Sequence, residues 1–336
     1  MAKEKIGVIG AGSWGTSIAI LLSEKGHDVS LWVYENDLSK RMIRSRVNDL
    51  YFPDFKVPDD LHITSSLENA LKGNDIIVSA VPSHALRKVL KDLAPFLFEN
   101  VVIVSCTKGI ENNTLMIPSE IMKDVLPKGL HKRLSFLSGP SFAVEAARKL
   151  PTAVSVASYE RDIGLRVQSV FNTLYFRVYT NPDVIGVELG GALKNVIAIA
   201  SGASDGLKYG HNTRAALITR GLREISRLGV ALGANPMTFS GLSGLGDLVL
   251  TCTGELSRNR TVGYKLGQGM KLKDILSEMK MVAEGVNTTK AAYGLSKKLK
   301  VNMPITEETY LVLYNDKPPK EAVTELMTRA LKDEIG

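Results

Sequence analysis

Short runs of β-branched residues alternate with segments of helical spacing in the first half of the chain. The strand-like runs cover residues 5–9, 28–33, 75–81, 101–105, 133–138, 152–158 and 176–180. Between them, apolar residues recur at intervals of three and four, most clearly over residues 16–25, 83–97 and 162–172. This alternation predicts βαβ units, and therefore an α/β fold with a mostly parallel sheet covered by helices on both faces.

The strand signal ends at Asn181-Pro182-Asp183. Beyond it, apolar residues keep helical spacing over residues 184–201, 213–228, 287–299 and 305–314. A last helix is expected behind Pro318 and Pro319, because proline suits the first turn of a helix. The pattern and the length of 336 residues together predict two domains: an α/β domain of residues 1–181 and an all-α domain of residues 182–336.

The composition, 44% hydrophobic and 23% charged, is typical of a globular protein and excludes disordered and fibrous classes. The longest uninterrupted apolar stretches fall far short of the roughly 20 residues that span a bilayer, so we expect no membrane span. The N-terminus lacks the apolar core of a signal peptide. Two cysteines far apart, Cys106 and Cys252, argue against a disulfide framework, so a cytoplasmic location is expected.

The chain is basic, with a net charge of +7. Such a charge fits an anionic ligand, nucleic acid or a membrane surface. The lysines are dispersed along the sequence, however, which favours a solvated basic surface. Nucleic-acid binding would call for a basic stripe with aromatic platforms, and only 6% of the residues are aromatic. We therefore expect no nucleic-acid partner.

Gly10, Gly12 and Gly15 form a G-x-G-x-x-G pattern between the first predicted strand and the first predicted helix. There the first glycine permits a tight turn, the second lets backbone approach a pyrophosphate, and the third lets helix and strand pack closely. A second strand ends about 20 residues later at Tyr34-Glu35, where an acid binds the ribose 2′-hydroxyl and repels a 2′-phosphate. The context predicts a Rossmann-like, doubly wound dinucleotide-binding domain. Glu35 favours NAD over NADP, although an exposed loop acid is an equal alternative.

Two lysines occupy positions suited to chemistry. Lys108 follows the strand predicted at 101–105, so it is expected at the carboxyl end of the sheet, where such folds bind ligands. Lys194 lies in an otherwise apolar helix, where burial would lower its pKa and suit it to proton transfer. The alternatives are a solvated surface lysine at 108 and a lysine snorkelling from a half-buried helix at 194.

Three further segments offer polar groups to a ligand. Gly139 and Ser141 follow a strand and supply small residues with free backbone N–H groups. A glycine-rich segment, 241–246, reads as a flexible turn that delivers Asp247. The run Ser257-Arg258-Asn259-Arg260 stands at a predicted helix start, where an arginine fork and helix N–H groups would bind phosphate. A hydrophilic helix cap is the alternative for that run. No Cys and His spacing indicates a metal site.

Taken together, these motifs resemble those of the bacterial-type glycerol-3-phosphate dehydrogenases. The matching segments run nearly from end to end, at residues 10–16, 108–110, 138–143, 193–196, 212–216, 241–252, 257–260 and 282–286. The resemblance implies reversible reduction of dihydroxyacetone phosphate to sn-glycerol 3-phosphate by NAD(P)H, a reaction that supplies the backbone of glycerophospholipids. It also implies a homodimer.

By the same resemblance, Lys194 transfers the proton at the substrate C2 oxygen, and Lys108 polarises that oxygen beside the nicotinamide. The implied substrate pocket consists of Lys108, Gly139, Ser141, Lys194, Asp247, Ser257, Arg258 and Asn259. The resemblance implies further cofactor contacts beyond the glycine motif and Tyr34-Glu35. These are Ser13, Trp14, Lys108, Ala143, Arg258, Val282 and Glu284, in addition to Gly10, Gly12, Gly15, Tyr34 and Glu35. Tyr34 departs from the many members with a basic residue at the end of the second strand, which weakens NADP use without excluding it.

Two other functions stay open from the sequence. One is a related two-domain dehydrogenase of a 3-hydroxy acid or a sugar acid, which would not need the phosphate-binding run at 257–260. The other is a non-catalytic protein that responds to NAD or binds nucleic acid, which the basic pI of about 9.2 permits.

Overall fold

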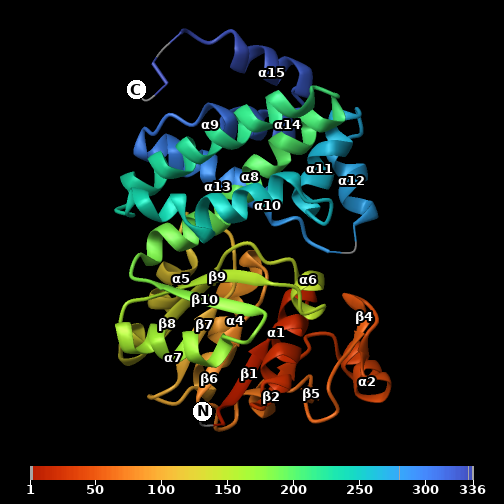
Figure 1. Cartoon of the computed structure of the whole chain (residues 1–336), viewed down its shortest axis with the longest axis vertical. Coiled ribbons are helices and arrows are strands. Elements are labelled where there is room, and N and C mark those ends of the chain that lie inside the picture. Colours follow the sequence, from red (N-terminus) through yellow and green to blue (C-terminus); the bar gives the residue numbers. More distant parts are fainter. Residues whose placement is uncertain (1–2, 280, 332, 335–336) are drawn as a thin grey trace.

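An eight-stranded sheet forms the centre of the first half of the protein, and a layer of helices forms the second half (Figure 1). The computed structural model describes residues 3–279, 281–331 and 333–334. The strand order is β10-β9-β8-β7-β6-β1-β2-β5, and all neighbours are parallel except β8 and β9. The strands are β1 (Lys5–Ile9), β2 (Asp28–Trp32), β5 (His62–Thr64), β6 (Ile76–Ser79), β7 (Val102–Ser105), β8 (Leu134–Ser138), β9 (Thr152–Ser158) and β10 (Phe176–Asn181). The predicted mostly parallel sheet is confirmed.

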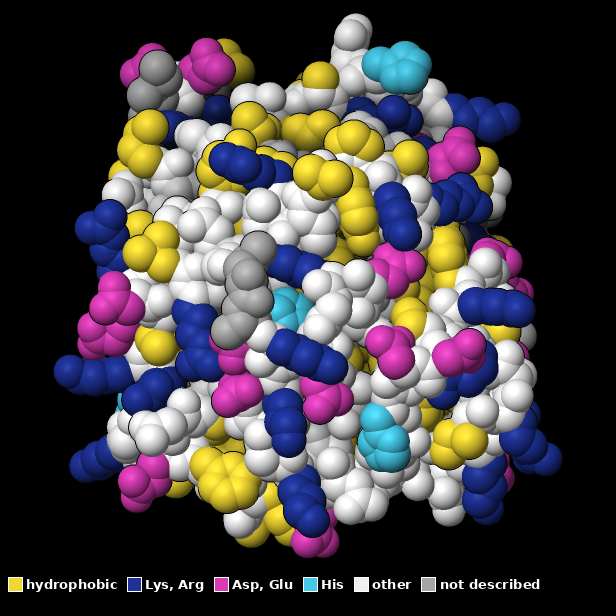
Figure 2. Space-filling view, turned by 60° about the horizontal axis from the view of Figure 1, so that its bottom comes forward, with side chains coloured by type: hydrophobic (Ala, Val, Ile, Leu, Met, Phe, Trp, Pro, Cys, Tyr) yellow, Lys and Arg dark blue, Asp and Glu magenta, His cyan; other side chains and the backbone are white. Residues whose placement is uncertain are grey.

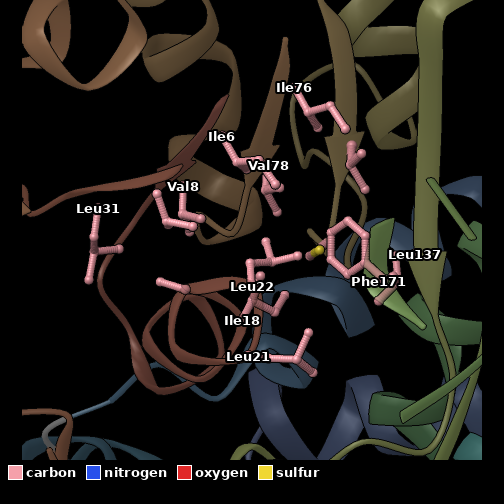
Figure 3. Packing of buried hydrophobic residues seen from close by; sticks show 14 of the residues in the cluster. Ile6, Val8, Ile18, Leu21, Leu22, Leu31, Ile76, Val78, Leu137 and Phe171 are labelled. Carbon is pink, nitrogen blue, oxygen red and sulfur yellow. The ribbon is translucent and has the colours of Figure 1, made fainter. Parts of the chain in front are cut away.

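Helices cover both faces of this sheet because the central strands are apolar on both sides. On β1, Ile6 and Val8 face one core, while Ile9 faces the other. The first core, shown in Figure 3, packs Ile18 and Leu22 of α1 against the sheet. The second core contains residues of α4 and α5. The helices of this half are α1 (Ser13–Glu24), α2 (Asn36–Ser45), α3 (Leu67–Leu71), α4 (Leu86–Leu93), α5 (Pro118–Val125), α6 (Ala143–Ala147) and α7 (Arg161–Phe171).

Every strand that the sequence predicts is present, and three further strands are present that it does not predict. β3 (Val47–Asn48) and β4 (Phe52–Lys56) form a separate two-stranded antiparallel sheet, and β5 is an edge strand. Single turns of 3₁₀ helix also occur at η1 (Ser83–Ala85), η2 (Ala94–Phe96) and η3 (Lys128–Arg133). The chain passes from β2 on one side of β1 to β6 on the other, so the topological switch point lies between β1 and β6.

The second half is helical throughout the residues that the structure describes. Its elements are α8 (Val184–Gly206), α9 (Gly210–Ala231), η4 (Pro236–Ser240), η5 (Leu242–Gly246), α10 (Asp247–Thr253), α11 (Arg258–Gly267), α12 (Leu272–Glu278), α13 (Glu284–Leu299), α14 (Pro304–Tyr314) and α15 (Pro319–Met327). Each helix predicted here is found, and α10 and α12 are additional. Both cysteines are free and buried.

Helix α8 is the core of the helical half. By length and composition alone it could cross a membrane, with a mean hydropathy of 1.5, but 89% of its most apolar window is buried inside the protein. Helices α9, α10, α11, α13 and α14 pack against it (Figure 1). Its apolar character is therefore explained by its position at the centre of a bundle.

Candidate active site

The glycine motif forms a tight turn at the switch point of the sheet. Gly10 has a positive φ of 108°, which favours glycine, and a Cβ atom at Gly15 would lie 1.9 Å from the carbonyl oxygen of Gly10. Among the residues that the structure describes, a Cβ atom at Gly12 would meet nothing within 4 Å, and no side chain caps the N-terminus of α1. The turn therefore leaves an open approach to a helix N-terminus, which fits a dinucleotide diphosphate.

The end of β2 lies beside a tyrosine that sequence reasoning missed. The Tyr51 hydroxyl donates a hydrogen bond to Glu35 Oε1 at 2.6 Å. Burial, followed by the nearby Glu35 carboxylate, raises the pKa of Tyr51 to about 12, so this hydroxyl keeps its proton. Tyr34 is 69% exposed, and its ring meets only the edge of the Trp32 ring among aromatic neighbours. Of this pair, the structure thus fixes Glu35 and leaves the Tyr34 side chain in solvent.

Ser13 and Trp14 open α1 beside this region. The Ser13 hydroxyl donates to the backbone oxygen of Tyr51 at 2.6 Å. Trp14 is half-buried and packs on the core, with its ring 6.3 Å from that of Phe176. Ala143 begins α6, and its carbonyl oxygen accepts from Ser17 of α1 at 3.1 Å. These contacts fix the first turns of α1 against Tyr51, β10 and the start of α6.

Lys108 and Lys194 meet at one buried carboxylate, that of Asp247. Lys108 Nζ lies 2.6 Å from Asp247 Oδ2, and Lys194 Nζ donates to Asp247 Oδ1. Lys194 also donates to Thr251 Oγ1 at 2.8 Å. Asp247 is fully buried and Lys194 is 8% exposed, so Lys194 does not snorkel into solvent. Thr251, one helical turn after Asp247, is a site residue that sequence reasoning missed.

The environment of Lys194 makes it easier to deprotonate than an ordinary lysine. Burial is the main cause and lowers its pKa from 10.5 to about 8. Within that net result, the negative charge of Asp247 opposes the lowering of the pKa and the positive charge of Lys108 contributes to it. An amine with such a pKa exchanges protons readily near neutral pH, as a general acid or base must.

Two glycines bring the end of β8 close to the lysine pair. A Cβ atom at Gly191 of α8 would lie 2.4 Å from Ser138 Oγ, so glycine lets the end of β8 pack against this helix, and the same position is in ordinary contact with Lys108 Cδ at 3.5 Å. Gly139 has a φ of 143°, and its carbonyl oxygen accepts from Lys108 Nζ at 3.1 Å and from Ser141 Oγ at 3.0 Å. The loop after β8 thus borders the lysine pair.

The segment before Asp247 is not the flexible turn that the sequence suggested. Residues Leu242–Gly246 form a π-helix that runs directly into α10, and Asp247 is the first residue of α10. A Cβ atom at Gly244 would lie 2.1 Å from the carbonyl oxygen of Phe239, and one at Gly190 of α8 would lie 2.4 Å from that of Ser243. Close packing, rather than mobility, therefore explains the glycines, and it fixes the carboxylate against α8.

The start of α11 presents the predicted phosphate-binding run. Ser257 caps the helix by accepting from the backbone N–H of Arg260 at 3.2 Å. Asn259 donates to Asn195 Oδ1 at 2.9 Å, which links this turn to the residue after Lys194. Arg258 is exposed and donates to the carbonyl oxygen of Val282 at 3.0 Å. Asn195 lies in the apolar helix that carries Lys194, and sequence reasoning missed its contact with Asn259.

Glu284, the first residue of α13, joins the two halves of the protein. Its carboxylate accepts from the backbone N–H of Ser83 at 3.1 Å and from the Ser83 hydroxyl. Burial raises the pKa of Glu284. Gly109, next to Lys108, packs against Ser83, since a Cβ atom there would lie 2.6 Å from Ser83 Cβ. Val282 is 40% exposed.

Within the described ranges, no cluster of three or more His, Cys, Asp or Glu side chains could hold a metal ion.

Comparisons with known proteins agree across the chain. The model of the NAD-dependent glycerol-3-phosphate dehydrogenase N-terminus matches residues 5–163, and that of the C-terminus matches residues 183–324. Glycerol-3-phosphate dehydrogenases [NAD(P)+] of Syntrophotalea carbinolica and Geobacter metallireducens are 57% and 58% identical, over 98% and 99% of this chain and 99% of each relative. A crystal structure of glycerol-3-phosphate dehydrogenase from Coxiella burnetii has a TM-score of 0.93 at 40% identity, covering 97% of this chain and 99% of that one.

Proposed function

The chain belongs to the NAD-dependent glycerol-3-phosphate dehydrogenase family, and from that membership we propose how its residues divide the family's reaction. The protein is an NAD(P)-dependent oxidoreductase that interconverts dihydroxyacetone phosphate and sn-glycerol 3-phosphate. The product is the backbone of glycerophospholipids. The observation that carries the assignment of roles is the meeting of Lys108 and Lys194 at the buried Asp247.

The two lysines act on the carbonyl oxygen of the ketone. Bound NAD(P)H supplies the hydride to the carbonyl carbon. Lys194 donates its proton to the C2 oxygen as negative charge develops there, and its lowered pKa suits it to this transfer. The positive charge of Lys108 stabilises that developing negative charge. Asp247 holds both Nζ atoms in place, and Thr251 orients Lys194.

The phosphate is bound at the start of α11. Arg258 offers a planar fork of donors, Asn259 is fixed by Asn195, and Ser257 begins the helix whose N-terminus favours an anion. Gly139 and Ser141 border the carbon skeleton from the loop after β8. Binding energy from the phosphate, remote from the reacting carbon, positions the ketone for hydride transfer.

The cofactor residues fall into two groups. Gly10, Gly12, Ser13, Trp14 and Gly15 surround the open N-terminus of α1 and would bind the diphosphate. Glu35, held by Tyr51, would accept from the ribose hydroxyls of NADH and repel the 2′-phosphate of NADPH, so we propose that NADH is preferred. Tyr34 lies exposed beside Glu35. We propose that the nicotinamide half of the cofactor is bordered by Lys108, Ala143, Arg258, Val282 and Glu284.

The finer features of assembly are also proposals. We propose that residues 1–181 and 182–336 act as two domains, and that the protein works as a cytoplasmic homodimer. The exposure of Met237, Leu245 and Val249, at 72%, 38% and 40%, supports an apolar contact face on the helical half. Light scattering after gel filtration measures the mass of the assembly, and a mass of about one chain would contradict the dimer.

The family's reaction is tested directly by absorbance at 340 nm. Dihydroxyacetone phosphate added to the protein with NADH is expected to cause rapid loss of absorbance, and NADPH is expected to be the poorer reductant. Protein that binds NADH without oxidising it on addition of this ketone would contradict the substrate assignment and favour a hydroxy-acid dehydrogenase instead.

A further inference from the structure

Asp205 carries an ion cluster that the catalytic scheme does not use. It lies near the end of α8, and its side chain is only 6% exposed. Arg214 of α9 donates to Asp205 Oδ1 from Nε and Nη2 at 3.0 and 2.7 Å. Arg260 of α11 approaches Oδ2 from Nε and Nη2 at 2.9 and 2.7 Å. One buried carboxylate thus ties three helices together, each arginine contacting one of its oxygens.

The same three-helix junction contains an unusually close helix crossing. A Cβ atom at Gly202 of α8 would lie 2.0 Å from the carbonyl oxygen of Arg260, and one at Gly206 would lie 2.3 Å from that of Tyr264. On α11, a Cβ atom at Gly263 would lie 1.9 Å from the carbonyl oxygen of Ile199. Backbone therefore packs on backbone where α8 and α11 cross, and Asp205 lies between the two glycines of α8.

This junction leads directly into the phosphate-binding turn. Arg260 is held at its backbone N–H by Ser257 and at its side chain by Asp205. Arg258 and Asn259 lie between these two anchored residues. Asp205 itself follows Lys194 by eleven residues, or about 16 Å along α8, so it is too far to contact a three-carbon phosphate that reaches Lys194. The contact that links Asp205 to the phosphate-binding turn is the one with Arg260 of α11.

We propose that Asp205 is a positioning residue for the substrate phosphate, acting by holding Arg260 and thereby the orientation of Arg258 and Asn259. Arg214 fixes the Asp205 carboxylate from the opposite side. The proposal rests on the proposed function, because it assumes that the turn at Ser257–Asn259 binds phosphate. It also gives a role to Arg260, which belongs to the predicted run at 257–260 but not to the implied substrate pocket, and whose side chain contacts Asp205.

The test compares a phosphorylated with an unphosphorylated ketone. Asp205→Asn keeps the size of the side chain and removes its charge. It is expected to lower kcat/KM for dihydroxyacetone phosphate about 10- to 100-fold, the scale of a misplaced binding group. The kcat/KM for dihydroxyacetone, which has no phosphate, is expected to change less than about twofold. Equilibrium binding supplies a second readout: protection from thermal unfolding by sn-glycerol 3-phosphate is expected to weaken in this variant.

An exposed aspartate–arginine pair in the other half of the protein provides a control for the removal of one aspartate charge. Asp49 accepts two hydrogen bonds from Arg41, at 2.8 and 3.0 Å. Asp49→Asn is expected to leave kcat/KM unchanged for both ketones. If Asp205→Asn lowers kcat/KM equally for both ketones, the residue has a general structural role and the proposal is overturned. The proposal is also overturned if kcat/KM falls for neither ketone.

If Asp205→Asn does not fold, Arg214→Lys takes its place, because lysine keeps the charge and loses the fork. Its ratio of kcat/KM values for the two ketones is expected to fall about tenfold, and an unchanged ratio would overturn the proposal. Failure of the wild-type protein to use dihydroxyacetone phosphate would instead contradict the proposed function.

Discussion

Lys194 is predicted to set the pH dependence of the reaction in both directions. Burial lowers its pKa from 10.5 to about 8. The ammonium form gives up the proton during ketone reduction, so kcat/KM for reduction is expected to fall as the pH rises through 8. The neutral amine accepts the proton during alcohol oxidation, so kcat/KM for oxidation is expected to rise over the same interval.

The size of the effect follows from the titration of one group. With a pKa of about 8, about ten lysines in eleven are protonated at pH 7 and about one in eleven at pH 9. An ordinary lysine would still be more than about 90% protonated at pH 9. Both pH profiles are measured as initial rates at 340 nm. Reduction is followed with dihydroxyacetone phosphate and NADH, and oxidation with sn-glycerol 3-phosphate and NAD. A midpoint of about 10 in both pH profiles would refute the role of Lys194.

A neighbouring substitution separates this electrostatic reasoning from other causes. Lys108→Met removes the positive charge that lowers the pKa of Lys194, so the midpoint is expected to move upward while the rate falls. Lys88→Met, on the exposed side of α4, removes a similar charge elsewhere and is expected to leave the midpoint in place. A midpoint that stays fixed in Lys108→Met would show that the two lysines are not coupled.

Three further substitutions test the ends of the site. Arg258→Ala removes the guanidinium fork that would bind the phosphate, a charge-assisted contact of about 1.5–3 kcal/mol. KM for dihydroxyacetone phosphate, measured by initial rates, is therefore expected to rise about 10- to 100-fold. An unchanged KM would contradict the assignment of Arg258 to the phosphate. Glu35→Gln is expected to lower KM for NADPH relative to NADH, and a constant ratio would contradict the role of Glu35. Gly15→Ala places a Cβ atom 1.9 Å from the carbonyl oxygen of Gly10, so NADH binding, measured by fluorescence titration, is expected to be lost.

The parts of the fold that the sequence predicts are those whose cause is local. Central strands such as β6 and β7 are buried on both faces, so they appear as continuous apolar runs. β4 was missed because its residues, Phe52–Lys56, are mostly exposed and include a proline. The reversed direction of β9 was also beyond the sequence, because the pattern of buried residues is the same in a strand that runs either way.

The candidate site divides in the same way. The Gly10–Gly15 turn can be predicted from the sequence because the positive φ of Gly10 and the close contact between Gly15 and Gly10 arise within six residues. The contacts of Asp247 do not, because they join it to Lys108 and Lys194, 139 and 53 residues away. The hydrogen bond from Tyr51 to Glu35 crosses from a loop to the end of β2. Such pairs depend on how the elements pack, and no local pattern in the chain encodes them.

Glycine offers a way to read some of this packing from the sequence. In α8, Gly190 lies against the π-helix before Asp247, Gly191 lies against Ser138 at the end of β8, and Gly202 and Gly206 lie against α11. Glycine inside a helix costs about 1 kcal/mol relative to alanine, so these four of the five glycines in α8 need a compensating reason. Here that reason is the approach of a neighbouring segment that carries a site residue. These four glycines therefore mark, along one helix, the places where the segment before Asp247, the end of β8 and the helix of the phosphate-binding turn are brought against it.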